Sequence, residues 1–123
     1  MTPTPPVYVI DDEEPVRASL AKLLRAMGYP SRAFASAAAY LESDVAGGEG
    51  CLLLDLRMPG MSGLDLIEEL NRRGLSVPTI VMTGHTDVRS VQRLEALSIV
   101  GFLEKPFSVE QLREMLDRWR LPG

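Results

Sequence analysis

The chain is organised around residues 51–60, which read CLLLDLRMPG. Four apolar residues lead into a carboxylate, Asp55, and a proline and a glycine follow it closely. A short continuous apolar run bounded by turn-forming residues is typical of a strand buried on both faces, and the turn leaves the acid at the end of that strand. In an open α/β sheet, ligands bind outside the carboxyl ends of the strands. We therefore expect Asp55 to lie in a functional site.

Length and composition predict a single domain. The chain has 123 residues, of which 46% are hydrophobic and 24% charged, as in an ordinary globular domain with one core. We expect this domain to span residues 1–123, with its core at about 7–119. Hydrophobic periodicity predicts five strands that alternate with five helices. The expected strands cover 7–10, 31–34, 51–55, 77–82 and 101–104; the expected helices cover 15–27, 36–41, 63–73, 88–97 and 109–119.

This alternation predicts an α/β fold with a parallel sheet covered on both sides. The commonest arrangement at this length is the flavodoxin-like (βα)5 doubly wound sheet, with strand order 2-1-3-4-5. Three serines are expected to cap helices: Ser36, and Ser62 and Ser108 within capping boxes.

Charge and cysteine content exclude several classes of protein. The net charge of −4 and the pI near 5.0 argue against direct nucleic-acid binding, because phosphate binding needs a basic face. No segment approaches the roughly 20 apolar residues that span a bilayer, and the first residues lack the pattern of a signal peptide. We expect a cytoplasmic location without membrane contact. The single cysteine, Cys51, is expected to be a core residue.

The predicted topology brings five polar side chains to one edge of the sheet. Asp11 and Asp12 follow the first strand, Asp55 ends the third, and Thr83 and Lys105 follow the fourth and fifth. Three carboxylates in one pocket repel each other unless a cation lies among them. Mg²⁺ prefers oxygen ligands and commonly binds one or two carboxylates together with phosphate oxygens. Lys105 would pair with Asp55 at rest or with a phosphoryl oxygen later, and the Thr83 hydroxyl and nearby backbone N–H groups would donate to the remaining oxygens.

These motifs resemble those of the response-regulator receiver domain of bacterial two-component systems. The resemblance rests on the acidic pair 11–12, on Asp55 with Met58-Pro59-Gly60 and Gly63 behind it, on Thr83, and on Lys105-Pro106. It covers about residues 7–119. Segments 56–61, 82–85 and 102–107 are most similar to the nitrogen-fixation regulator FixJ and its relatives.

The resemblance implies that Asp55 accepts a phosphoryl group from the phosphohistidine of a sensor histidine kinase, or from a small donor such as acetyl phosphate, with Mg²⁺ required. It implies no turnover enzyme, but a phosphoacceptor that catalyses its own phosphotransfer and its own dephosphorylation with the help of Thr83 and Lys105. Phosphoryl transfer demands positioning and charge neutralisation more than covalent chemistry from the protein.

The resemblance also assigns the metal ligands. Asp12 would bind Mg²⁺ directly, Asp55 would add a carboxylate oxygen, Arg57 would give its backbone carbonyl, and Asp11 would orient a metal-bound water. The side chains of Arg57 and His85 would flank the attacking water and set the lifetime of the phosphoryl group. A lone histidine in a loop is more often an ordinary loop residue than a catalyst, and this is the alternative for His85.

The resemblance places the conformational switch at Thr83 and Phe102. Phosphorylation would draw the Thr83 hydroxyl inward and vacate space for Phe102, which stands where tyrosine is common. The responding face would comprise segments 88–97, 101–104 and 109–119, and it would bind an output domain, a partner protein or a second phosphorylated copy, with transcription as the expected output. Ser98-Ile99 replaces a common Gly-Ala pair, so we expect an altered end of helix 88–97.

Two other functions deserve comparison. A phosphate-independent pseudo-receiver would act only as an interaction module, although no acidic residue of the expected pocket is missing. A hydrolase of the haloacid dehalogenase type would need a second acid two residues beyond the nucleophile, where this chain has Arg57.

Overall fold

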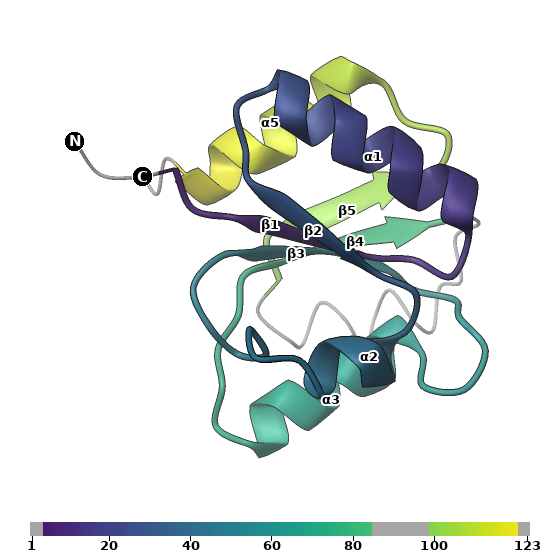
Figure 1. The fold of residues 1–123 in the computed structure, drawn as a ribbon, viewed down its shortest axis with the longest axis vertical. Helices are drawn as coiled ribbons and strands as arrows, with labels where there is room; N and C mark the ends of the chain where they lie inside the picture. Colours follow the sequence, from purple (N-terminus) through teal and green to yellow (C-terminus); the bar gives the residue numbers. More distant parts are fainter. Residues whose placement is uncertain (1–3, 85–98, 121–123) are drawn as a thin grey trace.

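The protein contains one five-stranded parallel sheet with the strand order β2-β1-β3-β4-β5. The computed structural model describes residues 4–84 and 99–120. The strands are β1 (Val7–Ile10), β2 (Ser31–Phe34), β3 (Cys51–Asp55), β4 (Thr79–Thr83) and β5 (Gly101–Glu104) (Figure 1). This arrangement confirms the predicted flavodoxin-like order.

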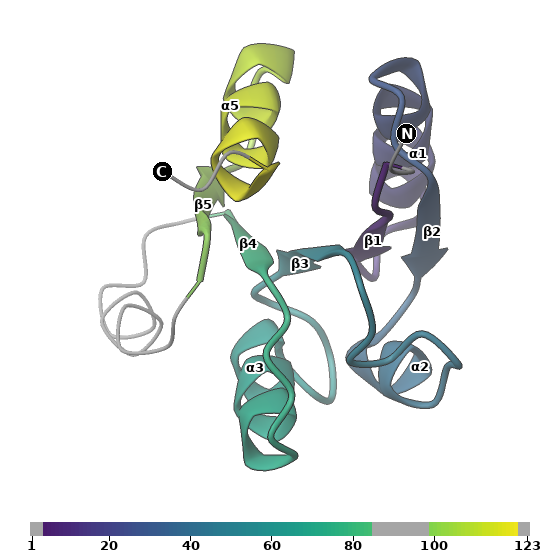
Figure 2. The same ribbon diagram turned by 90° about the vertical axis from the view of Figure 1, so that its left-hand side faces the viewer.

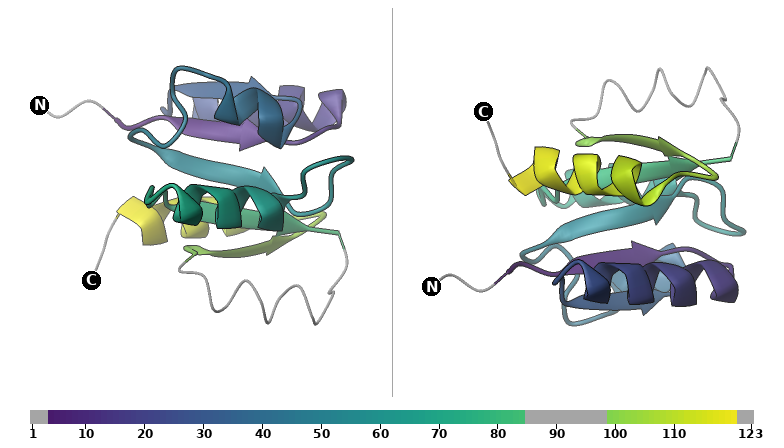
Figure 3. Two further views of the ribbon diagram at one scale, coloured as in Figure 1. Left: turned by 90° about the horizontal axis from the view of Figure 1, so that it is seen from below. Right: turned by 90° about the horizontal axis from the view of Figure 1, so that it is seen from above.

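Helices cover both faces of the sheet. The described helices are α1 (Glu14–Ala26), α2 (Ala37–Leu41), α3 (Gly63–Arg72) and α5 (Val109–Arg120). Figures 2 and 3 show α1 and α5 on one face and α2 and α3 on the other. The helix predicted at 88–97 and its end at Ser98 lie outside the described residues. None of the described helices has the length and apolar composition needed to cross a membrane.

The central strand β3 explains why its sequence is apolar without interruption. Leu52 and Leu54 belong to the hydrophobic cluster under α2 and α3, whereas Cys51 and Leu53 belong to the cluster under α1 and α5. Successive side chains of a strand point to opposite faces, so a strand covered by helices on both sides needs an apolar residue at every position. Cys51 is a fully buried core residue, as predicted, and burial raises the pKa of its thiol to about 12.

The three predicted serine caps are present. Ser36 Oγ accepts a hydrogen bond from the backbone N–H of Ala39 at 3.0 Å. Ser62 and Ser108 each form the reciprocal capping box, with Asp65 and Gln111 as their partners. These caps satisfy backbone donors that have no partner within the helix.

Strand β4 is displaced from its predicted range. It comprises Thr79–Thr83 rather than 77–82. Pro78 has no N–H to donate to a ladder, although its carbonyl still accepts a hydrogen bond from the Leu52 N–H at 2.9 Å. Thr83 therefore lies within the strand, where the sheet fixes its backbone.

Candidate functional site

Neighbouring strands bring the three acids together. Strands β1 and β3 are adjacent, and Ile10 pairs with Leu54, so the following residues, Asp11 and Asp55, lie side by side at the carboxyl edge of the sheet. One carboxylate oxygen from each of Asp11, Asp12 and Asp55 lies within 4.8 Å of the others. Asp11 is fully buried, Asp55 is 6% exposed and Asp12 is exposed. Clustered carboxylate oxygens open to solvent on one side fit a hard divalent cation such as Mg²⁺.

Lys105 reaches this cluster from the end of β5. Its backbone N–H donates to the carbonyl of Thr83 at 2.7 Å, which ties the ends of β4 and β5 together. Its Nζ lies 2.8 Å from Asp11 Oδ2 and 3.7 Å from Asp55 Oδ2. The expected resting pair with Asp55 is present as an ion pair, but the hydrogen bond goes to Asp11. The Asp11 carboxylate is fully buried, so leaving it without a partner costs more free energy than leaving Asp55, which reaches the surface, without one.

Two further groups hold Asp11. The backbone N–H of Glu13 donates to Asp11 Oδ1 at 2.9 Å, and the Arg17 guanidinium donates through Nη1 to the Asp11 carbonyl at 2.8 Å. Sequence reasoning missed both contacts. A signal was present for Arg17, since it is the first basic residue after the acidic run and falls on the first turns of the predicted helix.

Asp55 is held mainly by the backbone around it. Its Oδ1 accepts a hydrogen bond from the N–H of Arg57 at 3.3 Å. Gly63, at the start of α3, approaches so closely that an added Cβ would lie 2.5 Å from the Asp55 carbonyl oxygen. Only glycine allows this approach, and the contact positions α3 against the end of β3.

The site raises the pKa values of both Asp55 and Lys105. Burial raises the pKa of Asp55 to about 6; the Lys105 ammonium opposes this rise, and the Asp11 carboxylate adds to it. Burial alone would lower the pKa of Lys105, but its hydrogen bond to Asp11 and its attraction to Asp55 outweigh burial and raise that pKa. At neutral pH the site therefore contains a charged ammonium and an Asp55 carboxylate that is more basic than an ordinary aspartate.

The structure also places the expected switch and rate-tuning residues. Thr83 is 7% exposed and ends β4 at the same edge. Phe102 pairs with Val81 across β4 and β5 and is half-buried against the cluster under α2 and α3. The Arg57 side chain is exposed two residues beyond Asp55. His85 lies outside the described residues.

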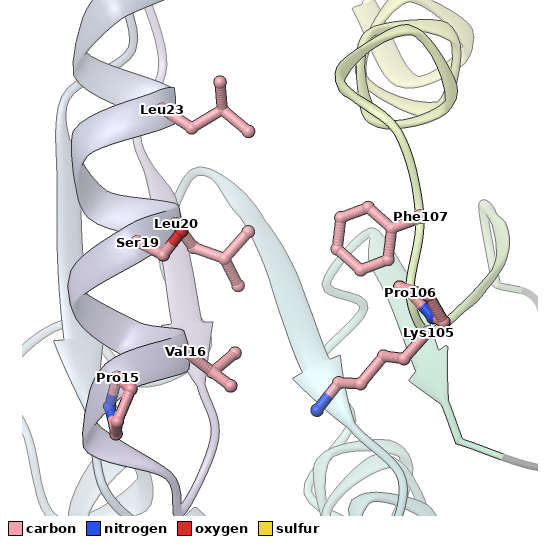
Figure 4. Close-up of a pocket in the computed structure, with 8 residues that line it drawn as sticks. All are labelled: Pro15, Val16, Ser19, Leu20, Leu23, Lys105, Pro106 and Phe107. Atoms are coloured by element: carbon pink, nitrogen blue, oxygen red, sulfur yellow. The ribbon is translucent and has the colours of Figure 1, made fainter.

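A groove adjoins the site between α1 and residues 105–107. Its volume is about 510 Å³. Its lining residues are Pro15, Val16, Ser19, Leu20, Leu23, Lys105, Pro106 and Phe107. Figure 4 shows the Lys105 side chain extending into the space between its loop and α1, with the Phe107 ring facing the helix. Lys105 thus connects an apolar groove on one side to the acidic cluster on the other.

Comparisons with known proteins agree with this geometry. Residues 7–117 match the profile of the response regulator receiver domain family. The transcriptional regulatory protein FixJ of Azorhizobium caulinodans is 50% identical over 102 residues, which are 83% of this chain and 48% of that protein. FixJ of Rhizobium meliloti is 40% identical over 112 residues, which are 91% of this chain and 55% of that protein.

Solved structures give the same result. The crystal structure of FixJ-N has a TM-score of 0.85 and 39% identity, and the match covers 96% of this chain and 94% of that one. The response regulator StyR has a TM-score of 0.82 and 36% identity, and the match covers 94% of this chain and 58% of that one. The chain spans about half the length of the curated relatives it matches. It belongs to the response regulator receiver domain family, among whose members it is similar to FixJ.

Proposed function

We propose that Asp55 accepts a phosphoryl group from the phosphohistidine of a sensor histidine kinase in a Mg²⁺-dependent reaction. One observation carries this proposal: the Asp11, Asp12 and Asp55 carboxylates converge within 4.8 Å, beside the Lys105 ammonium. Receiver domains are signalling modules rather than turnover enzymes, and the site holds the charges that such a transfer needs. The whole chain, residues 1–123, would act as one cytoplasmic receiver domain without nucleic-acid or membrane contacts of its own.

The cation would be held by the Asp12 and Asp55 carboxylates and the Arg57 backbone carbonyl, with Asp11 orienting a metal-bound water. When bound, Mg²⁺ supplies positive charge that offsets the acids and the incoming phosphoryl oxygens. The raised pKa of Asp55 supports this assignment, because burial and, to a lesser extent, the neighbouring Asp11 and Asp12 carboxylates disfavour its charge, which a bound cation would offset.

In the transfer, a carboxylate oxygen of Asp55 forms a bond to phosphorus while the bond from phosphorus to the histidine nitrogen breaks. The nitrogen keeps the electron pair of the broken bond. Lys105 moves its ammonium toward the phosphoryl oxygens, and the Thr83 hydroxyl donates to one of them. Both groups start from this edge of the sheet, since Lys105 Nζ lies 3.7 Å from Asp55 Oδ2 and Thr83 ends the adjacent strand.

Dephosphorylation is the second self-catalysed step. Water attacks the phosphorus, the phosphoryl group leaves Asp55 as inorganic phosphate, and the carboxylate returns. The exposed Arg57 side chain starts two residues from Asp55, where it can influence the approach of water. We assign rate tuning to Arg57 and His85.

The output would pass through Thr83 and Phe102 to the face formed by segment 88–97, β5 and α5. Phe102 is half-buried, so an inward shift of Thr83 would change the space available to its ring. This face would bind an output domain, a partner protein or a second phosphorylated copy. The similarity to FixJ, named as a transcriptional regulator, supports transcription as the output.

Incubation with acetyl phosphate and Mg²⁺, followed by intact-mass analysis and peptide mapping, tests the proposal. We expect one phosphoryl group on Asp55, none after chelation of Mg²⁺, and none on Asp55→Asn. A histidine kinase that phosphorylates itself, used as donor, would test the kinase reaction in the same assay. An unmodified Asp55 in folded protein with saturating donor and Mg²⁺ would instead support the phosphate-independent pseudo-receiver.

A further inference from the structure

We propose that Arg17 is a positioning residue for the divalent-cation site. Its guanidinium holds the backbone of Asp11 and thereby keeps the two acids that follow β1 in their ion-binding arrangement. This inference rests on the Mg²⁺ site proposed above. It adds a residue of α1 that is not itself a ligand.

The contact links the helix directly to the loop that carries the acids. Arg17 is half-buried on α1, and its Nη1 lies 2.8 Å from the carbonyl oxygen of Asp11. Hydrogen bonds from a charged donor are stronger than those between neutral groups. The Arg17 backbone N–H also donates to the Glu13 carbonyl at 3.1 Å, so the same residue spans both ends of the short loop between β1 and α1.

The hydrogen bond from Arg17 to the Asp11 carbonyl also restrains the backbone of the next residue, Asp12. This carbonyl belongs to the planar peptide group that leads into Asp12, so holding it sets the direction in which Asp12 leaves the strand. The side chain of Asp11 is already fixed by Lys105 and by the Glu13 N–H. Asp12 is exposed, so its position depends on the backbone that Arg17 holds.

A purely electrostatic role for Arg17 predicts the opposite result. A positive charge close to the acids repels an incoming cation, so removing that charge alone would strengthen Mg²⁺ binding. Loss of the positioning contact would weaken binding, because groups that orient metal ligands contribute strongly to metal affinity. The direction of the change in affinity therefore separates the two roles.

The test compares Arg17→Gln with Arg25→Gln, which removes an exposed guanidinium from the last turn of the same helix. Calorimetric Mg²⁺ titration of the metal-free proteins, without phosphodonor, is expected to give roughly tenfold weaker binding for Arg17→Gln. Arg25→Gln is expected to match the wild type. Equal or tighter Mg²⁺ binding by Arg17→Gln would overturn the inference.

A metal-free measurement keeps this inference separable from the proposed function. Hydrogen exchange of the Glu13 amide, which donates to Asp11 Oδ1, is expected to accelerate in Arg17→Gln while the amides of β3 keep their wild-type rates. An unchanged Glu13 rate, or an equal acceleration in β3, would refute local positioning. If wild-type protein bound no Mg²⁺, the proposed function would fail, and the Glu13 exchange rate would still decide whether Arg17 orders the loop.

Discussion

Replacing Asp55 with asparagine should stabilise the metal-free fold at neutral pH. Burial is the main reason that the pKa of Asp55 rises from 3.8 to about 6, and Asp11 adds to it against the pull of Lys105. Such a rise makes the ionised carboxylate about 3 kcal/mol less favourable in the folded state than in the unfolded chain. Asparagine has nearly the same volume and carries no charge. Since this figure already includes the opposing pull of Lys105, we expect a net gain in unfolding free energy of about 1 to 3 kcal/mol.

The gain should depend on pH with a definite sign. A carboxylate with a raised folded-state pKa destabilises the fold fully above about pH 6, and the effect disappears as pH falls through 6 toward 3.8. Urea unfolding with a metal chelator, at pH 7.5 and again near pH 4.5, measures the difference between Asp55→Asn and wild type. Asp117→Asn, an exposed change on α5, controls for the loss of one negative charge from the protein.

The outcome that refutes this reasoning is specific. If metal-free Asp55→Asn were no more stable than wild type at pH 7.5, burial of the ionised Asp55 carboxylate would not destabilise the fold. A gain of the same size near pH 4.5 would also refute it, because ionisation could not then be the cause. Saturating Mg²⁺ should reduce the difference by stabilising the wild type.

Three further predictions follow from the same contacts. Lys105→Gln leaves the buried Asp11 carboxylate without its ammonium, so we expect the free energy of unfolding of the metal-free protein in urea to fall by about 2 to 3 kcal/mol. Modification by acetyl phosphate should also become slower. Unchanged stability would mean that the ion pair between Lys105 and Asp11 does not stabilise the fold. Gly63→Ala places a Cβ 2.5 Å from the Asp55 carbonyl oxygen, and we expect a loss of about 1 to 3 kcal/mol in the free energy of unfolding. Gly84→Ala, whose Cβ meets no atom of the described residues within 4 Å, should be nearly neutral. Mg²⁺ affinity should fall roughly tenfold per pH unit below pH 6, since the cation competes with a proton on Asp55. Calorimetric titration with Mg²⁺ at pH 5 and pH 7 measures this difference, and equal affinities at the two pH values would contradict the prediction.

The fold could be predicted from the sequence because its signals are local and agree with one another. The uninterrupted apolar run of β3 requires cover on both faces, and Ser36, Ser62 and Ser108 mark the starts of their helices. The start of β4 could not be placed, since Val77 before Pro78 and Thr79 after it are both β-branched and favour a strand equally until the ladder hydrogen bonds are known.

The meeting of the acids was also predictable, because parallel strands end at one edge of the sheet. The distribution of hydrogen bonds within the site was not. Which carboxylate accepts the hydrogen bond from the Lys105 ammonium depends on the relative burial of Asp11 and Asp55. The contact of Arg17 with the Asp11 carbonyl depends on the direction of α1 relative to the loop that precedes it. Neither the relative burial nor the direction of the helix can be predicted from the spacing of residues along the chain.

The different surroundings of two neighbouring acids support the proposal that Asp55, rather than Asp11, accepts the phosphoryl group. Both oxygens of Asp11 accept hydrogen bonds, from Lys105 and from the Glu13 N–H, and its side chain is fully buried. Within residues 4–84 and 99–120, Asp55 accepts one long backbone hydrogen bond, and its Oδ2 lies 3.7 Å from the ammonium, beyond hydrogen-bonding distance. A carboxylate with fewer hydrogen bonds and a raised pKa keeps more basic lone pairs, yet a pKa of about 6 leaves it ionised at neutral pH. In the proposed transfer, Lys105 would keep its hydrogen bond on Asp11 and leave the Asp55 oxygens available for attack, while its ammonium, 3.7 Å from Asp55 Oδ2, would be close enough to neutralise the incoming phosphoryl group.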